Sequence, residues 1–342
     1  MADLPDAAAI DTAFTWRDGE RLTVFRAGVL ADAAAELEEN GWGRYELLTT
    51  PRALATAAVE LPGRAHAVHE VPPGPVPEAA AAVIGAVEVP TLVALGGGRV
   101  IDAAKAIAAV RGGRAAAIPT TLSGAEMTRI HRFPSGYEAP HRVRPELVLA
   151  DPEPMTSLPE DDLRASAINA ISHGIEPLYA PGRNPVATLA ALHGIELCCS
   201  ALDQPPGERD RPALALGSLL CAYALDSAGL GLHHVVCQSL VRTMAIPHAK
   251  AYATMLPRTI GAIAAREPEA IAAVADAIGV RPERLAARLE ELGGGPRRLV
   301  DIGADPSAVG AAVDAMLARA ELRESAEPPS REELVALVES AL

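Results

Sequence analysis

The chain has 342 residues, of which 49% are hydrophobic, enough to build the cores of two domains. Its 30 basic and 44 acidic residues give a formal net charge of −14, which argues against a broad basic face for nucleic acid. A small anionic ligand is still allowed, because one or two arginines and a few backbone N–H groups can bind it. No signal peptide and no membrane span are expected from the apolar patterning.

Strand-like and helix-like segments alternate over the first part of the chain. A glycine at position 41 suits the end of the first helix, and a proline at position 51 suits the start of the second. This alternation predicts a parallel sheet with crossover helices. The predicted strands are 21–28, 44–50, 90–98 and 114–121, and the predicted helices are 29–42, 51–61, 79–88 and 99–110. The segment 129–150 fits either a hairpin or an irregular loop.

The strand signal fades after about residue 155, and long Ala/Leu-rich segments indicate helices up to a capped last one at 329–342. We therefore predict an α/β domain over 1–155 and an all-helical domain over 156–342. The four cysteines match no zinc or disulfide spacing, so buried reduced thiols and a cytoplasmic protein are expected. They are Cys198, Cys199, Cys221 and Cys237.

The segment "ALGGGRVIDAAK" (94–105) carries three glycines between a predicted strand and a predicted helix. Glycines let the backbone approach a bulky anion, and the helix start offers N–H groups to phosphate, as in dinucleotide binding. The spacing differs from the usual G-x-G-x-x-G pattern, and a simple tight turn is the alternative. Asp102 and Lys105 follow three residues apart, so they either face the ligand together or form a local ion pair.

Four segments in this order and spacing resemble the iron-containing alcohol dehydrogenase superfamily, most closely its maleylacetate reductase branch. They are "ALGGGRVIDAAKAIA", "AIPTTLSGAEMT" (117–128), "LVLADPEPMTSLPEDDLRASAINAISHGIEPLYA" (147–180) and "GLHHVVCQSL…IPHAKAYATMLP" (231–257). The resemblance covers most of 20–260. It implies the superfamily fold, shared with dehydroquinate synthase, in which an α/β dinucleotide-binding domain precedes an all-α domain.

The resemblance also implies site residues. The pyrophosphate of NADH or NADPH is expected at the glycine turn and at the Pro-Thr-Thr turn. The cofactor-binding residues are then Gly96, Gly97, Gly98, Arg99, Asp102, Thr120, Thr121 and Ser123. The positions that hold a metal in other members are Asn169, His173, His234 and His248, and a further histidine position is held by Gln238. We predict all five as catalytic residues and give the neighbouring His233 a structural role.

Asn169 stands where a carboxylate would be needed for a hard ion such as Fe²⁺. Three histidines alone can hold zinc, so His173, His234 and His248 are the expected ligands if a metal binds. Members of the maleylacetate reductase branch resemble this chain in carrying asparagine there and work without metal. The resemblance thus implies a metal-independent enzyme.

The implied reaction is hydride transfer to an unsaturated keto acid or a related carbonyl compound, with the histidines donating to the oxygen that gains charge. Arg129, Arg164 and Arg242 are the candidate partners of the anionic substrate. No acidic residue follows the second predicted strand to bind the ribose 2′-hydroxyl and reject a 2′-phosphate, and Arg52 could favour that phosphate. Either NADH or NADPH is therefore possible as the cofactor.

Three alternatives are a non-redox lyase, cyclase or isomerase on this scaffold, a metal-dependent alcohol dehydrogenase, and a non-catalytic binding subunit. The intact glycine turn, Pro-Thr-Thr turn and three histidines count against the last. A small-molecule substrate is the expected partner. The resemblance further implies a homodimer.

Overall fold

The computed structural model describes residues 13–295, 297–323 and 327–342. Two compact units divide the chain. The first takes in the chain up to Ser157 together with Asp210–Ala215, and the second takes in Leu158–Arg209 and Leu216–Leu342.

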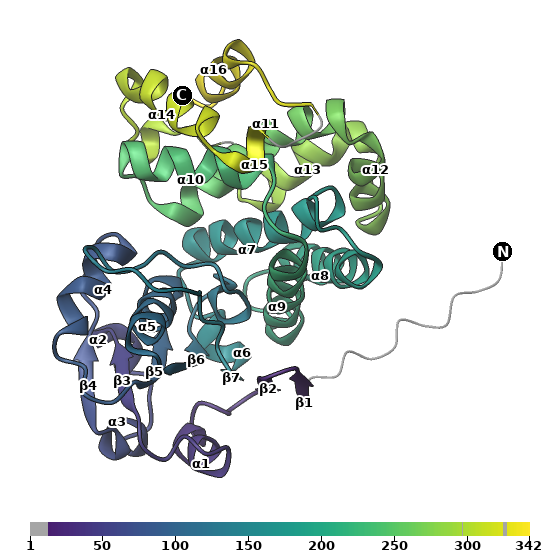
Figure 1. The fold of residues 1–342 in the computed structure, drawn as a ribbon. Coiled ribbons are helices and arrows are strands. Elements are labelled where there is room, and N and C mark those ends of the chain that lie inside the picture. The colour runs from purple at the N-terminus through teal and green to yellow at the C-terminus, as the bar shows by residue number, and fades with distance from the viewer. Residues whose placement is uncertain (1–12, 296, 324–326) are drawn as a thin grey trace. The chain divides into compact units, whose positions relative to one another are not determined.

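The first unit contains a seven-stranded sheet with the order β1-β2-β7-β6-β5-β3-β4 (Figure 1). Only the β1–β2 pair is antiparallel, and the other neighbours run parallel. The prediction of a mainly parallel sheet is confirmed. The strands are β1 (Ala13–Asp18), β2 (Arg21–Arg26), β3 (Glu46–Thr49), β4 (Ala67–Glu70), β5 (Thr91–Gly96), β6 (Arg114–Pro119) and β7 (Leu147–Ala150).

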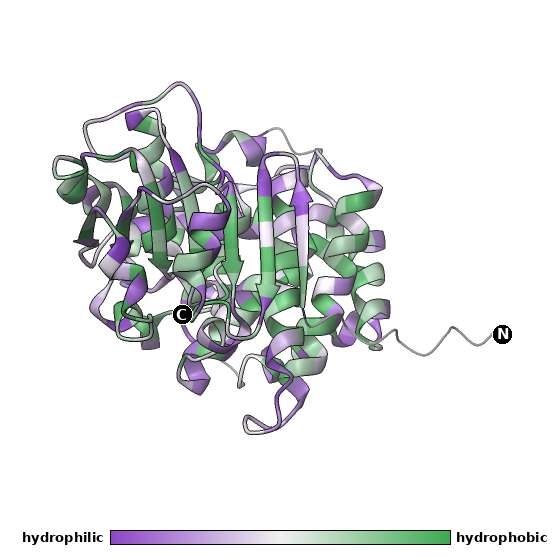
Figure 2. Cartoon of the chain, turned by 90° about the horizontal axis from the view of Figure 1, so that it is seen from below, coloured by the Kyte–Doolittle hydropathy of each residue, from purple (hydrophilic) through white to green (hydrophobic). Residues whose placement is uncertain are grey.

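Helices cover both faces of this sheet. Alternate residues of a strand point to opposite faces, and here they pack into two different apolar clusters. Leu92 and Ala94 of β5 pack with α4 (Val76–Ile84) and α5 (Gly98–Arg111). Val93 and Leu95 pack on the other face, in a cluster that includes residues of α1 (Ala33–Glu39), α2 (Pro51–Leu54) and α3 (Glu60–Arg64). The inner strands are accordingly hydrophobic along most of their length (Figure 2).

Three segments of this unit differ from prediction. β1 and β4 were not predicted, because their exposed and half-buried residues alternate and give no continuous apolar signal. The predicted helix 51–61 is two short helices, α2 and α3, separated by a turn. For 129–150 the sequence allowed either a hairpin or an irregular loop. The structure shows irregular chain up to β7 and no hairpin.

The chain after β7 is helical. Its helices are α6 (Pro152–Met155), α7 (Glu160–Ile175), α8 (Pro185–Asp203), α9 (Arg211–Ala228), α10 (Leu232–Met244), α11 (His248–Arg266), α12 (Pro268–Ala277), α13 (Leu285–Leu292), α14 (Val309–Leu317), α15 (Ala320–Arg323) and α16 (Arg331–Glu339). Short 3₁₀ turns occur between them, among which η2 (Glu176–Leu178) continues directly from α7. The predicted cap of the last helix is present as a reciprocal Ser330–Glu333 capping box.

The break between α9 and α10 positions the candidate site. The two helices meet at an angle of 100° across the Gly-Leu-Gly segment 229–231. Gly229 has φ +95°, which favours glycine, and a Cβ on Gly231 would lie 2.6 Å from the Tyr179 ring. α10 therefore begins at Leu232, and His233 and His234 fall in its first turn.

Among the described helices, α8 is long and apolar enough to cross a membrane, with half of that stretch buried inside the protein. α9 and α10 meet the same test only together, as a bent pair.

Gly113, which links α5 to β6, offers a test of this packing. A Cβ there would lie 1.8 Å from the Pro90 carbonyl oxygen, so we expect Gly113→Ala to lower the free energy of unfolding by about 1–3 kcal/mol. Gly85→Ala is the matched control, since nothing lies within 4 Å of its Cβ position. Denaturant unfolding of both variants checks this, and equal effects would contradict it.

Candidate active site

The glycine turn lies at the carboxyl end of β5, next to the end of β6. Gly96 pairs with Pro119, and the Thr120 N–H donates to the Gly96 carbonyl at 3.0 Å. On the other side, the Thr49 hydroxyl at the end of β3 donates to the Leu95 carbonyl at 2.9 Å. The chain crosses from β4 back over β3 to β5 here, and such a reversal of strand order is where open α/β sheets bind ligands.

Close packing explains the glycines of this turn. A Cβ on Gly97 would lie 3.1 Å from Thr121 Cγ2, and a Cβ on Gly98 would lie 3.0 Å from Ser123 Cβ. The structure thus brings together the two segments that were predicted to bind the cofactor. α5 starts at Gly98 without a side-chain cap, so the N–H groups of its first turn are suited to bind a pyrophosphate.

Behind the turn, Lys105 forms a buried anchor rather than a ligand contact. Its ammonium pairs with Asp102 at 2.7 Å and donates to the carbonyls of Ala125, Thr128 and Ile130 at 2.8–3.0 Å. This is the local ion pair that the sequence left open as an alternative. A cofactor contact by Asp102 or by Arg99, whose Nε is buried without a partner among the described residues, stays a prediction.

Glu126 lies beside this anchor and is completely buried. Neither carboxylate oxygen has a hydrogen-bond partner in the described part of the chain. Burial raises the pKa of Glu126 to about 7, against the opposing effects of its own backbone N–H and of Lys105.

In the second unit, α7 carries Asn169 and His173 one turn apart, both buried. Asn169 Oδ1 and His173 Nδ1 are buried and find no hydrogen-bond partner within the described ranges. Burial and the neighbouring imidazoles, chiefly His234, hold the pKa of His173 well below its ordinary value. His173 is therefore a neutral imidazole, and its Nδ1 has no hydrogen-bond partner in the described part of the chain.

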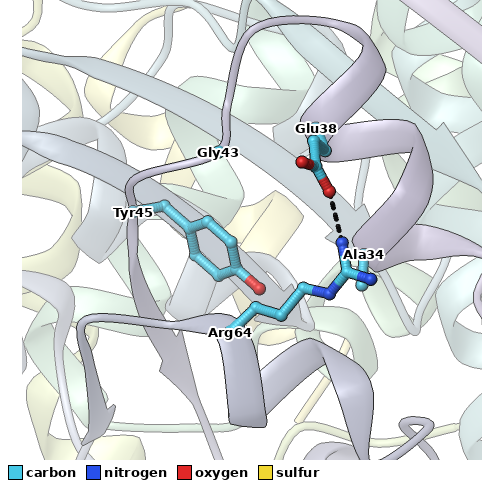
Figure 3. Close-up of a pocket in the computed structure, with 5 residues that line it drawn as sticks. All are labelled: Ala34, Glu38, Gly43, Tyr45 and Arg64. Carbon is cyan, nitrogen blue, oxygen red and sulfur yellow. Dashed lines mark hydrogen bonds and ion pairs between the residues drawn. The ribbon is translucent and has the colours of Figure 1, made fainter.

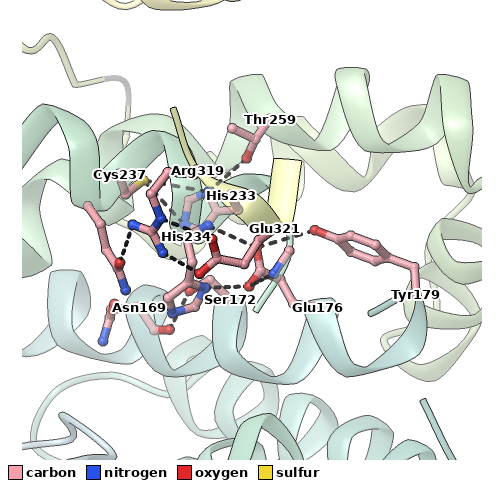
Figure 4. A network of polar contacts seen from close by, with 12 residues as sticks. Asn169, Ser172, Glu176, Tyr179, His233, His234, Cys237, Thr259, Arg319 and Glu321 are labelled. Atoms are coloured by element: carbon pink, nitrogen blue, oxygen red, sulfur yellow. Dashed lines mark hydrogen bonds and ion pairs between the residues drawn. The ribbon is translucent and has the colours of Figure 1, made fainter. Parts of the chain in front are cut away.

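His234 is held by Glu176, a residue that the sequence did not single out. The Glu176 carboxylate lies 2.5 Å from His234 Nδ1 and also accepts from the backbone N–H groups of His234 and Gly231 at 2.9 and 2.8 Å (Figure 4). The Tyr179 hydroxyl donates to it at 3.3 Å. Burial acts to raise the pKa of Glu176, but His234 and these donors outweigh it and lower the pKa. An ionised carboxylate requires the proton on Nδ1, which leaves Nε2 for a ligand.

Tyr252 of α11 links the other histidines to this pair. The His173 and His234 rings stack with centroids 5.2 Å apart, and the Tyr252 ring meets His234 edge-on at 5.1 Å and stacks on His248 at 4.2 Å. The structure thus brings His173, His234 and His248 into one cluster. His233 bonds to the Thr259 hydroxyl at 2.9 Å, and burial lowers its pKa to about 3, which fits the structural role given to it.

The three arginine candidates lie in different surroundings. Arg129 is 58% exposed, near Glu20, and Arg164 pairs with Glu160 at 2.6 Å at the start of α7. Arg242 instead donates to the side-chain oxygen of Gln238, one of the predicted site residues, at 3.3 Å. That oxygen also accepts from Arg319 at 2.9 Å.

The donor set does not fit a ferrous ion. It offers imidazoles and an amide, and Glu176, the carboxylate beside His234, is occupied by four donors. The amide oxygen of Gln238 is occupied by two cationic side chains. No group of three or more His, Cys, Asp or Glu residues suited to a metal occurs in the described ranges.

A surface hollow of about 470 Å³ lies in the first unit (Figure 3). It is lined by Ala34, Glu38, Gly43, Tyr45 and Arg64. Tyr45 immediately precedes β3, so this hollow lies at the amino end of that strand, whereas the glycine turn follows the carboxyl end of β5.

Comparison with known proteins agrees with this geometry. Residues 21–152 match the family described as iron-containing alcohol dehydrogenase, and residues 164–342 match the C-terminal part of the Fe-containing alcohol dehydrogenase family. The chain therefore belongs to the iron-containing alcohol dehydrogenase family. Within it, the similarity is to the maleylacetate reductase branch, and the protein is an NAD(P)H-dependent oxidoreductase.

Two curated relatives and two solved structures illustrate the similarity. Maleylacetate reductase 2 of Cupriavidus pinatubonensis is 36% identical over 75% of this chain and 76% of its own length. The maleylacetate reductase of a Rhizobium species is 31% identical over 78% of this chain and 81% of its own length. The structure of maleylacetate reductase from Agrobacterium tumefaciens has a TM-score of 0.81 at 28% identity, covering 96% and 98% of the two chains. The structure of a putative alcohol dehydrogenase from Ralstonia eutropha has a TM-score of 0.83 at 32% identity. The match covers 96% of this chain and 97% of that one.

The buried Glu126 yields a prediction for stability. Its folded pKa of about 7 lies above the ordinary value of 4.5, so the acid form is favoured on folding, and stability is lost as pH rises through that interval. Glu126→Gln keeps the neutral form. We expect the variant to match the wild type near pH 4.5 and to exceed its free energy of unfolding at pH 8 by about 1–3 kcal/mol.

Urea unfolding at both pH values checks this, because other titrating groups cancel in the difference. A constant difference between variant and wild type across this range would contradict it.

Proposed function

We propose that this enzyme reduces the conjugated carbon–carbon double bond of an anionic unsaturated keto acid, using NADH or NADPH and no bound metal. The observation that carries the proposal is the His234–Glu176 pair beside a neutral His173, in a cluster without a free carboxylate. With Glu176 balancing a protonated His234, an Nε2–H group could donate to a substrate oxygen that gains negative charge, and no free carboxylate lies in the cluster to bind a hard cation. The similarity to maleylacetate reductases supports the same substrate class.

The bound nicotinamide would supply the hydride. Addition of that hydride to the carbon β to the ketone would place the π electrons on the ketone oxygen, and a proton would then add to the α carbon. The protein must stabilise that oxygen with positioned N–H groups. His173 and His248 suit this role, and an imidazolium at His234, balanced by Glu176, suits proton transfer from Nε2.

In the first unit, the start of α5 and the Thr120–Ser123 segment would hold the pyrophosphate. The residues after β3 are Thr50, Pro51 and Arg52, and none of them is an acid that would reject a 2′-phosphate. The proposal therefore includes both NADH and NADPH as cofactors. A cytoplasmic location, expected from the cysteines, and a homodimer, implied by the resemblance, stay predictions.

Cofactor binding is the first test. Fluorescence titration with NADH and with NADPH should show saturable binding of at least one. Gly97→Val should weaken it about tenfold or more, because the added side chain enters the space of Thr121. Gly85→Ala is the control at an open position. Binding of neither cofactor to the wild type would refute the proposal.

Glu176→Gln tests the histidine. An amide cannot accept at both positions, so one N–H group would face either His234 Nδ1 or the backbone donors. We expect kcat to fall about 10–100-fold with the NADH dissociation constant unchanged. Tyr179→Phe removes only the longest of the four contacts and should stay within about threefold of the wild type. An unchanged kcat in Glu176→Gln would remove the proposed proton-transfer role of His234.

A further inference from the structure

The amide of Gln238 has a defined orientation. Gln238 lies one turn after His234 on α10, and its Oε1 accepts from Arg319 Nη1 at 2.9 Å and from Arg242 Nη2 at 3.3 Å. A guanidinium can only donate hydrogen bonds, so the atom that faces the two arginines must be the oxygen. The amide N–H₂ group therefore points away from them.

Arg319 is itself held in place. Its Nε and Nη2 donate to the two carboxylate oxygens of Glu321 at 3.0 and 2.6 Å, a two-pronged ion pair (Figure 4). The Arg319 hydrogen bonds lower the pKa of Glu321, so this carboxylate stays ionised. Arg319 precedes α15, a short helix that packs against α10. All three donor nitrogens of Arg319 are thus used within this unit, two on Glu321 and one on Gln238.

Gln238 shares one face of α10 with His234 of the histidine cluster, and its N–H₂ group lies on the side of the amide turned away from the arginines. Tyr252 is fully buried, and burial raises the pKa of its hydroxyl well above the ordinary value. Gln238 acts against this rise as a donor to that hydroxyl, although no contact meets the geometry of a full hydrogen bond among the described residues. Tyr252 in turn contacts His234 and His248, so a donor at this position would serve the cluster.

We propose that Arg319 is a positioning residue that, braced by Glu321, fixes Gln238 with its oxygen outward and its N–H₂ group toward the histidine cluster. The position then supplies a hydrogen-bond donor and withholds the oxygen that a metal would need. The donor role toward the substrate oxygen rests on the proposed function. The exclusion of a cation does not, because it follows from the amide orientation and the two guanidinium groups alone.

Glu and Gln have nearly the same shape, which makes Gln238→Glu a sharp test. One carboxylate oxygen would accept from the arginines as before, while the other would replace the N–H₂ donor. We expect a thermal midpoint at or above the wild type, an unchanged NADH dissociation constant, and a kcat about 100-fold lower. A kcat equal to that of the wild type would overturn the donor role.

The orienting role of Arg319 is tested by Arg319→Ala and Arg319→Lys. Loss of the brace should lower kcat about tenfold with little change in NADH binding, and lysine should recover part of it, since an ammonium can still donate to Gln238. Arg323→Ala, an exposed arginine on the same short helix, is the control and should match the wild type. Equal kcat values for Arg319→Ala and the wild type would overturn the positioning role.

A zinc titration separates this inference from the proposed function. In the double variant Arg242→Ala/Arg319→Ala the amide oxygen is released beside three imidazoles, a donor set that zinc accepts. Competition with a chromogenic zinc chelator should show at least tenfold tighter binding than by the wild type. Equal affinities would refute cation exclusion by the arginines. This result stands even where the wild type binds no NADH, the outcome that would refute the proposed function instead.

Discussion

The buried carboxylate of Glu176 is the constraint on which the histidine cluster of the second unit depends. A charge without solvent is tolerated only where hydrogen bonds replace water, and here four donors do so. Two of them are backbone N–H groups of Gly231 and His234 at the start of α10. The same carboxylate that caps α10 therefore orients the His234 ring. The sharp turn at 229–231 is needed for this, because it directs the start of α10 toward the end of α7.

A second buried charge has a comparable role in the sheet unit. Lys105 is fully buried, and its ammonium holds three carbonyls of the 125–130 segment as well as Asp102. That segment follows Ser123, which packs against Gly98. The glycine turn is therefore braced from behind by a cation whose hydrogen bonds are satisfied by protein. A loop that must approach a pyrophosphate closely benefits from such fixed positions, because it loses less conformational entropy when the ligand binds.

Local patterns were sufficient to predict much of this architecture. The glycine turn was predictable because a strand, three glycines and a helix are contiguous. Asn169 and His173 were instead implied by the family resemblance, and their four-residue spacing agrees with a shared helix face. Glu176 could not be recognised from sequence, since its partner His234 is 58 positions away and nothing local marks that glutamate as buried. Arg319 could not be recognised either, because it lies 81 positions from Gln238 in a segment whose sequence pattern predicts only helix. β1 and β4 escaped prediction because their residues are half exposed and owe their conformation to pairing with β2 and β3.

The placement of charge around the histidines shows how a family scaffold named for iron can suit a different ligand. A metal site presents anionic oxygens to its centre. In this chain the carboxylate beside His234 acts on the far side of the imidazole, at Nδ1, and the amide oxygen of Gln238 is turned toward Arg319. The polar groups that remain are the imidazoles and the side chain of Asn169, whose oxygen has no partner among the described residues. On the proposed function, imidazole N–H groups would complement a substrate oxygen that gains negative charge, so the same helices would surround an anion in place of a cation.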